Sequence, residues 1–285
     1  MKTTLIPMDV NSAPTTWSAF NIKAATADAE LKGLVASFPP PELMQRVSGL
    51  TDHASFAKSG SDIFLALVKA SPKPLSAYIS ILDFGVGSGR LARMFKGFKG
   101  RYTGADVDHE LVEWVGAALP WVRSMPTTAR EPLPTKRADF DCVISISVFT
   151  HMNEADSKFY LQSLMEASAP GAFLFLTVHG DRALKRAETE TRIFEMLSIP
   201  AEGVSEARSA MNAGGFKFIL QNGHLTTETY EYGISFTSEA YIHAEWGKYF
   251  DIVSIEKASI HDFQDIVVLR RRKDSLLSRL MSYFG

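Results

Sequence analysis

The sequence predicts an α/β protein built on a mostly parallel β-sheet with helices on both faces. Two observations support this fold class. Short apolar runs rich in β-branched residues alternate with segments of helical periodicity through the middle of the chain. One of these runs opens the stretch ILDFGVGSGR, in which three glycines stand on alternate positions directly after a predicted strand. At 285 residues and 46% hydrophobic content, the chain can bury a large core.

Charge and composition argue against several classes of protein. The 30 basic and 32 acidic residues give a net charge of −2, so we expect no nucleic-acid partner. The N-terminus lacks the apolar stretch of a signal peptide, and no window approaches the ~18 apolar residues of a membrane span, so we expect a cytoplasmic protein. The single cysteine, Cys142, lies in an apolar run and is expected to be a buried, inert thiol.

Helical patterns dominate the start of the chain. Apolar residues from Trp17 to Phe38 follow helical spacing, and the three prolines after them stop any helix. A short helix is expected over ELMQRV and another from about Ser61 to Ala70. We therefore divide the chain into an N-terminal helical cap, 1–60, and a main domain, 61–285.

The main domain begins with alternating strands and helices. YISILDFG is a predicted strand, LARMFKGF a helix, RYTGADVD a strand and HELVEWVGAAL a helix. FDCVISISVF is a further strand, followed by the helix EADSKFYLQSLMEASA and the buried strand GAFLFLTVHG. This alternation is typical of a parallel sheet.

An insertion is expected at about 181–235, where the charged helical stretch DRALKRAETETRIFEML leads into the glycine-bearing segment NAGGFKFILQNGH. A helix over SEAYIHAEWGKYF follows it. Two strands, DIVSIEKASI and DFQDIVVLRRR, come next, with a turn near His261 between them. The domain therefore ends in a predicted antiparallel pair.

The glycine-rich stretch departs from both common phosphate-binding motifs. A dinucleotide fingerprint needs glycine where Arg90 stands, and the Gly-Lys-Ser/Thr of a Walker-type loop is missing. What remains is Asp83 followed by Gly85, Gly87 and Gly89. A carboxylate at the start of the loop suits a ligand with an ammonium group rather than a pyrophosphate. Alone, such a glycine triplet is also compatible with a simple tight turn.

Asp106 stands at the expected end of the second strand, where a carboxylate can accept hydrogen bonds from both hydroxyls of a ribose. Together with the glycine loop it resembles the class I S-adenosylmethionine-dependent methyltransferase family. FDCVISISVFTHM resembles that family's fourth strand and following loop, and LMEASAPGAFLFLT its next helix and fifth strand, so the pattern covers roughly 60–180. The resemblance implies a Rossmann-like, seven-stranded, mostly parallel sheet with a terminal antiparallel strand, and S-adenosyl-L-methionine as the cofactor.

The resemblance also implies roles for single residues. Asp83 would hold the cofactor's amino group and the three glycines would wrap its methionine part, while Asp106 would bind the ribose and Val107 would lie against the adenine. In the matching stretch TTAREPLP, the family's usual contact to the adenine amino group is displaced or replaced. Two neighbours are expected to have simpler roles: Asp108 as the N-cap of the next helix, and Arg90 as a solvated or locally paired side chain.

A hydroxyl acceptor needs a base as well as alignment with the methyl carbon. Candidates are His151 in SVFTHM and His179 in LTVHGD, because they follow the fourth and fifth strands. The resemblance gives His151 an alternative role, packing beneath the cofactor. His179 is our first choice as the catalytic base, and His151 the second.

Other side chains near the same strand ends have alternative interpretations. His261 and Asp265 flank the last turn and could reach the acceptor, although Asp265 also suits a backbone-bonding turn. The aromatic residues of TYEYGISF could line an acceptor pocket or belong to the core: Tyr230, Tyr232 and Phe236.

Metal independence is expected. The polar residues after the fourth strand, Asn153, Glu154 and Asp156, fit a helix start, where carboxylates are favoured by the helix dipole. They do not suggest a magnesium site.

The acceptor is indicated only by a looser similarity. FPPPELMQRVSGL, SGSDIF, LTVHGD and FQDIVVLRR are similar to segments of methyltransferases of bacterial surface-glycan and related secondary biosynthesis. O-methylation of a sugar hydroxyl is therefore the leading hypothesis. N- or O-methylation of a small molecule or natural product is the alternative, and a cofactor-binding scaffold without catalysis is a third.

The tail RRRKDSLLSRLMSYFG carries an amphipathic pattern with basic residues around an apolar stripe. A terminal helix docked on its own domain is one interpretation. Weak, salt-sensitive contact with the inner face of a membrane is the other, since a glycan acceptor can be lipid-linked.

Overall fold

The computed structural model describes residues 8–221 and 231–273. The chain divides into two compact units, Met1–Thr128 and Ala129–Gly285. In the described part of each unit, strands and helices follow one another as an α/β fold requires.

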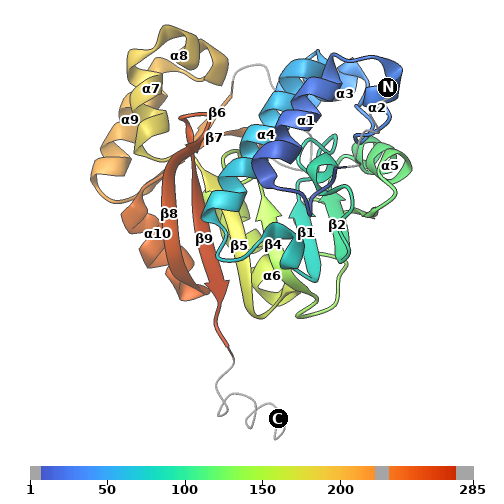
Figure 1. Cartoon of the computed structure of the whole chain (residues 1–285). Helices are drawn as coiled ribbons and strands as arrows, with labels where there is room; N and C mark the ends of the chain where they lie inside the picture. Colours follow the sequence, from blue (N-terminus) through green and yellow to red (C-terminus); the bar gives the residue numbers. More distant parts are fainter. Residues whose placement is uncertain (1–7, 222–230, 274–285) are drawn as a thin grey trace, which may run out of the picture. The chain divides into compact units, whose positions relative to one another are not determined.

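The first unit begins with helices and continues with alternating strands and helices (Figure 1). Its elements, in chain order, are α1 (Pro14–Ala25), α2 (Ala29–Lys32), α3 (Pro41–Ser48), α4 (His53–Ala70), η1 (Leu75–Ala77), β1 (Ser80–Phe84), η2 (Ala92–Phe95), β2 (Arg101–Asp106), α5 (His109–Ala118) and β3 (Val122–Pro126). β1 pairs with β2, and β2 with β3, both in parallel.

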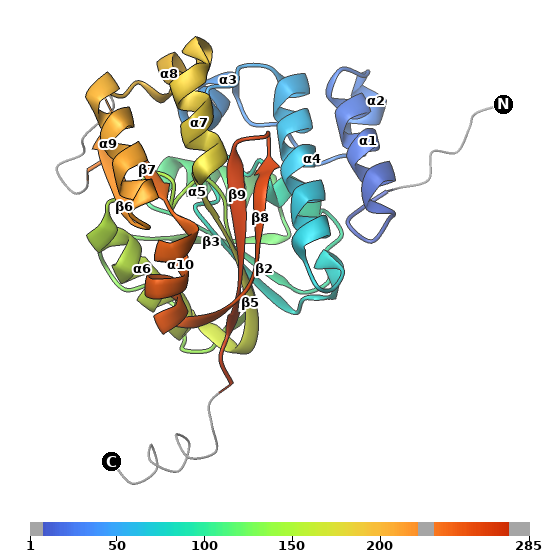
Figure 2. The ribbon, with the colours of Figure 1, turned by 90° about the vertical axis from the view of Figure 1, so that its left-hand side faces the viewer.

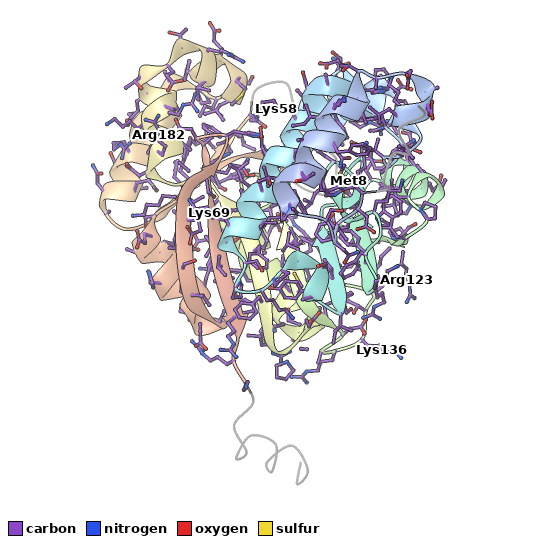
Figure 3. All side chains as sticks on the ribbon, in the orientation of Figure 1. Met8, Lys58, Lys69, Arg123, Lys136 and Arg182 are labelled. Atoms are coloured by element: carbon purple, nitrogen blue, oxygen red, sulfur yellow. The ribbon has the colours of Figure 1, made fainter. Side chains whose placement is uncertain are left out.

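Helix α4 starts earlier than its apolar pattern predicts. The side chain of Asp52 accepts a hydrogen bond from the Ser55 backbone N–H at 2.8 Å, which satisfies a first-turn donor and fixes the start at His53. The helix is amphipathic, with one face buried and Lys58 and Lys69 exposed (Figure 3). α4 therefore runs unbroken through residue 60, and the division into a cap and a main domain stays a prediction.

The second unit carries the remaining strands and the long insertion. Its elements are β4 (Phe140–Ser145), α6 (Glu154–Ala167), β5 (Ser168–Val178), α7 (Asp181–Thr189), α8 (Thr191–Leu197), α9 (Ala201–Asn212), β6 (Phe216–Leu220), β7 (Gly233–Thr237), α10 (Glu239–Glu245), η3 (Trp246–Lys248), β8 (Phe250–Ile260) and β9 (Gln264–Arg271).

β4 and β5 are parallel. β9 is antiparallel to both of its neighbours, β5 and β8 (Figure 2). His261 and Asp262 form the turn between β8 and β9 with φ of 56° and 53°. The seven strands take the order β3-β2-β1-β4-β5-β9-β8, and β6 and β7 form a separate antiparallel pair. The predicted class I methyltransferase fold, with its terminal antiparallel strand, is confirmed.

Some local predictions differ from the structure. LARMFKGF forms only the short 3-10 turn η2, because Lys96 leaves the helical path with a ψ of 131° and Gly97 follows with a φ of 83°. The charged helical stretch after β5 is split into α7 and α8 at Glu190, whose extended backbone interrupts the hydrogen bonding. β3 and α9 have no clear apolar period and were not predicted as separate elements.

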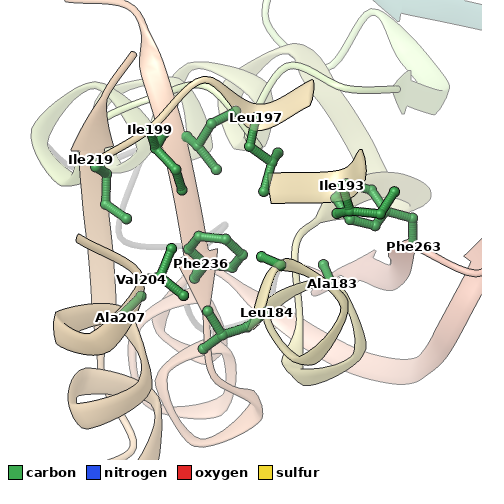
Figure 4. Packing of buried hydrophobic residues seen from close by; sticks show 12 residues of the cluster. Ala183, Leu184, Ile193, Leu197, Ile199, Val204, Ala207, Ile219, Phe236 and Phe263 are labelled. Atoms are coloured by element: carbon green, nitrogen blue, oxygen red, sulfur yellow. The ribbon is translucent and has the colours of Figure 1, made fainter. Parts of the chain in front are cut away.

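The insertion packs with Phe236 and Phe263, which follow it in the chain, in one hydrophobic cluster, shown in Figure 4. Phe236, on β7, is fully buried among Leu184 of α7 and Val204 of α9, with Ile199 and Ile219 beside them. Of the two alternatives for this aromatic residue, the core is therefore the one that the structure supports. The insertion is held together by apolar packing as well as by the β6–β7 ladder.

We predict that Phe236→Ala lowers the free energy of unfolding by about 3–5 kcal/mol, because it removes a buried ring and leaves a cavity. Met196→Ala, at a side chain that is 57% exposed in the same insertion, should change it by less than about 0.5 kcal/mol. Urea unfolding of both variants measures the difference. Equal effects would contradict the assignment of Phe236 to this core.

Candidate active site

The glycine loop after β1 adopts a backbone path that side chains resist. Gly85, Gly87 and Gly89 all have positive φ, at 84°, 52° and 78°. A Cβ on Gly87 would lie 2.6 Å from Cγ1 of Val47, which is on α3. The positive φ of residue 87 and the close approach of the Val47 side chain therefore both require glycine at this position.

Asp106 braces this loop at the end of β2. Its Oδ2 accepts a hydrogen bond from the Gly87 N–H at 2.8 Å, and its Oδ1 accepts one from the Asp108 N–H at 3.0 Å. Burial raises the pKa of Asp106, while these backbone donors oppose the shift. A carboxylate has about four lone-pair sites, so hydrogen-bonding capacity remains for the hydroxyls of a ligand.

Asp83 is the buried acid at the start of the loop. The Tyr102 hydroxyl donates a hydrogen bond to its Oδ2 at 2.7 Å. Burial raises the pKa of Asp83 to about 7, the nearby Asp106 adds to the rise, and the Tyr102 hydrogen bond opposes it. A cationic ligand would reverse the shift, because an ammonium group favours the ionised carboxylate.

The residues of the first unit fit S-adenosylmethionine. Val107 follows Asp106 with 39% of its surface exposed, as an apolar contact for an adenine ring requires. The buried hydroxyls of Ser88, in the loop, and Thr127, after β3, have no hydrogen-bond partner among the described residues. Such orphaned groups are costly unless a ligand or water satisfies them. The cradle thus offers an acid for the ammonium group, an acid for the ribose and unused hydrogen-bonding groups.

Helix α3 is attached beside this cradle by ion pairs that sequence reasoning missed. Arg46 contacts Asp108 at 2.9 Å and Glu110 at 2.6 Å. Asp108 is also the N-cap of α5, as predicted, accepting from the Glu110 and Leu111 N–H groups. These pairs are solvent-exposed, so they contribute little to stability but help to orient α3.

Arg130 belongs to the stretch TTAREPLP, which the resemblance places near the adenine, and it is bound to α6 of the second unit. Its guanidinium binds Asp156 of α6 through two hydrogen bonds of 2.7 and 3.0 Å, and its backbone N–H donates to the Tyr160 hydroxyl. Asn153 caps α6, so Asp156 lies in the first helical turn as predicted. Arg130 therefore has a structural partner on its own unit.

Two histidines follow adjacent parallel strands of the second unit. The Nδ1 of His151, after β4, lies 2.8 Å from the carbonyl oxygen of Gly233, and the Nδ1 of His179, after β5, lies 3.2 Å from that of Ser235. A carbonyl oxygen can only accept, so each neutral ring carries its proton on Nδ1 and Nε2 is the proton-accepting nitrogen. The ring centroids are 6.3 Å apart.

The surroundings of the two rings differ. His179 is buried between aromatic side chains, and burial, with a smaller contribution from nearby His151, lowers its pKa to about 3. His151 is half-buried and stacks on Tyr232 at a centroid distance of 4.6 Å. His179 is thus a neutral imidazole at pH 7 and a weak base.

The remaining candidates have mainly structural contacts. The Oδ1 of Asp265 accepts a hydrogen bond from the Ala258 N–H at 2.6 Å, which matches the backbone-bonding alternative, and burial raises its pKa. Cys142 is a buried free thiol, as predicted. Tyr230 lies outside the described residues. Within 8–221 and 231–273, no group of three or more His, Cys, Asp or Glu is placed to hold a metal ion, and metal independence stays a prediction.

Comparison with known proteins supports the interpretation of this fold. Residues 81–171 match the family model described as a methyltransferase domain. A protein from Pyrococcus horikoshii is similar in structure, with a TM-score of 0.54 and 13% identity over 74% of this chain and 90% of that chain. Burkholderia thailandensis 1,6-didemethyltoxoflavin-N1-methyltransferase, solved with 1,6-didemethyltoxoflavin and S-adenosylhomocysteine, has a TM-score of 0.50 and 14% identity over 95% and 94% of the two chains.

The structural likenesses, at such low identity, show the fold alone. The family match adds the class of protein, and it covers the glycine loop, Asp106 and the strand that precedes His151. The chain has the class I methyltransferase fold and is an S-adenosylmethionine-dependent methyltransferase, with S-adenosyl-L-methionine as its cofactor.

The expected membrane contact rests on residues that are largely outside the described part. Residues 274–285 are not described, and no helix among the described residues is long and apolar enough to cross a membrane. Of the basic residues before the tail, Arg271 is buried and donates to the carbonyl oxygens of Met165 and Ser168, while Arg272 pairs with Asp251. These two arginines are therefore engaged within the second unit, and the contact stays a prediction.

We predict that S-adenosylhomocysteine binding weakens as the pH falls. Asp83 must be ionised to hold the ligand's ammonium group, and with a pKa of about 7 it becomes protonated between pH 8 and pH 6. The dissociation constant from calorimetry should therefore rise by up to about tenfold per pH unit below 7. The variant Asp83→Asn should bind S-adenosylhomocysteine weakly at both pH 6 and pH 8, and its affinity should no longer depend on pH. A wild-type affinity that is constant from pH 6 to pH 8 would refute this role.

Proposed function

We propose that this methyltransferase acts on a hydroxyl group of a small-molecule or glycan acceptor, with a sugar hydroxyl as the leading candidate. The observation that carries the proposal is the pair of histidines after β4 and β5, both held by carbonyl groups of β7 with Nε2 as the proton-accepting nitrogen. Ligands of open parallel sheets bind outside the carboxyl ends of the strands, where these two residues stand. A hydroxyl acceptor is the class that needs such a base.

When bound, S-adenosylmethionine supplies a methyl group that is already activated by its sulfonium centre. The contributions of the chain are binding, orientation and proton transfer. Asp83 and the glycine loop would bind the methionine part, and Asp106 the ribose. His151 would take the acceptor's proton at Nε2, while its Nδ1–H bond to Gly233 fixes the orientation of the ring.

We place this role on His151 ahead of His179, which was the first choice from the sequence. The pKa of about 3 for His179 supports this order, because so weak a base accepts a proton poorly at neutral pH. His179 would instead support β7 through the Ser235 carbonyl and the Thr237 N–H, which donates to the His179 carbonyl at 2.9 Å.

The sugar acceptor is supported by the sequence similarity to surface-glycan methyltransferases, and a small-molecule acceptor is its main competitor. Release of S-adenosylhomocysteine should be measured with nucleotide sugars, simple glycosides, phenols and aromatic amines. Turnover with sugar hydroxyls is the expected result. Turnover with aromatic amines alone would contradict the hydroxyl acceptor and indicate N-methylation instead. Binding of the cofactor without turnover of any of these acceptors would favour a scaffold.

We predict that His151→Asn lowers kcat by about 10²–10⁴-fold while S-adenosylhomocysteine affinity stays within about twofold of wild type. Asparagine is chosen because its amide N–H can replace the Nδ1–H donor to Gly233 and so preserve the local structure. His179→Asn is the matched control for Ser235 and should have a smaller effect on kcat. Loss of turnover in His179→Asn with normal turnover in His151→Asn would assign the base to His179.

A further inference from the structure

The segment 231–235, which includes the start of β7, lies beside the loop that follows β4. His151, in that loop, donates from Nδ1 to the Gly233 carbonyl at 2.8 Å. Two residues away on each segment, the Ser235 hydroxyl donates to the Phe149 carbonyl at 2.7 Å. The two segments therefore run in opposite directions, and the loop that carries the candidate base is held at two points.

Tyr232 adds an aromatic contact between these segments. Its ring lies nearly parallel to the His151 imidazole, with the ring centroids 4.6 Å apart and an angle of 12° between the planes. Both side chains are half-buried. Because the next residue, Gly233, holds Nδ1 of the same imidazole, two consecutive residues contact the edge and the face of His151.

The titratable groups around His151 place a positive charge on this ring rather than on its neighbour. His179, at the end of β5, has its ring centroid 6.3 Å away, and burial keeps it neutral at pH 7. The Glu231 carboxylate, next to Tyr232, accepts a hydrogen bond at 3.2 Å from Asn153, two residues after His151. Tyr232 itself presents an aromatic face, which attracts a cation more strongly than a neutral ring.

We infer that Tyr232 is a positioning residue whose ring holds the His151 imidazole in place and stabilises the imidazolium that forms when His151 takes the acceptor's proton. The inference rests on the proposed function, in which His151 is the base. The proton moves from the acceptor's hydroxyl to Nε2 and the Nδ1–H bond to Gly233 is kept, so the ring gains one positive charge. The stacked phenol ring therefore stabilises the product of proton transfer more than its starting state.

Histidine side-chain NMR measures this effect in the protein without cofactor or acceptor. The chain has seven histidines, and His151→Asn identifies the resonance of His151 by its loss. Tyr232→Leu keeps an apolar side chain against the imidazole but removes the aromatic face, so the pKa of His151 should fall by about 0.4–0.7. Tyr232→Phe keeps the face, and the pKa of His151 should stay within about 0.2 of its wild-type value.

The same shift should appear in catalysis. The acid limb of the pH profile of kcat reports ionisation of the base, so Tyr232→Leu should move it to lower pH by the same amount. Loss of alignment should also lower kcat on the plateau about tenfold. Tyr249→Leu is the matched control, because Tyr249 is a half-buried tyrosine of the same unit that contacts Phe250, and its replacement should change neither the pKa nor the profile.

An equal pKa of His151 in wild type and Tyr232→Leu would overturn the inference, and so would an equal fall in Tyr232→Phe and Tyr232→Leu. Tyr232→Met supplies a second variant without the ring if Tyr232→Leu does not fold. Full turnover in His151→Asn would instead refute the proposed function on which the inference rests, whatever the NMR titration shows.

Discussion

The carboxylate of Asp106 is the constraint on which the cofactor cradle depends. It accepts the Gly87 N–H on one oxygen and the Asp108 N–H on the other, and so joins the loop after β1 to the end of β2. The Gly85 N–H adds a parallel contact, donating to the Ala105 carbonyl at 2.8 Å. A loop drawn this close to the next strand must turn sharply, which is why it carries glycines with positive φ. These hydrogen bonds are made within the chain itself, so they define the shape of the loop.

Much of this arrangement is local and could be predicted from the sequence. Apolar periodicity located β1, β2, β4 and β5, because buried strands read as continuous apolar runs. The spacing of Asp83 and the glycines indicated the ligand class, and Asp108 was identified as an N-cap from its position alone. These features depend on residues that are neighbours in the chain or that follow a known order of strands. The class of protein is implied by the resemblance of this set of motifs to the methyltransferase family.

The rest depends on contacts between distant segments. Val47 meets the glycine loop from α3, and Ser59 meets Arg90 from α4, but neither pairing has a sequence signal. His179 is packed between Phe236 of β7 and Phe263, which precedes β9. Carbonyl groups of β7 orient His179 and His151 from far along the chain. Sequence position shows that both histidines follow strands, but it does not show how deeply each ring is buried. The basicity of each ring is set by its packing, and for His179 that packing comes from Phe236 and Phe263, which are distant in the chain.

The most direct test of this account is calorimetric binding of S-adenosylhomocysteine to Asp106→Ala and Asp108→Asn. Asp106→Ala removes both the loop brace and the ribose acceptor, so binding should be at least about 100-fold weaker. Asp108→Asn lies two residues away and keeps an N-cap for α5, so its affinity should stay within about threefold of wild type. Wild-type affinity in Asp106→Ala would contradict the assignment of this loop as the cofactor site.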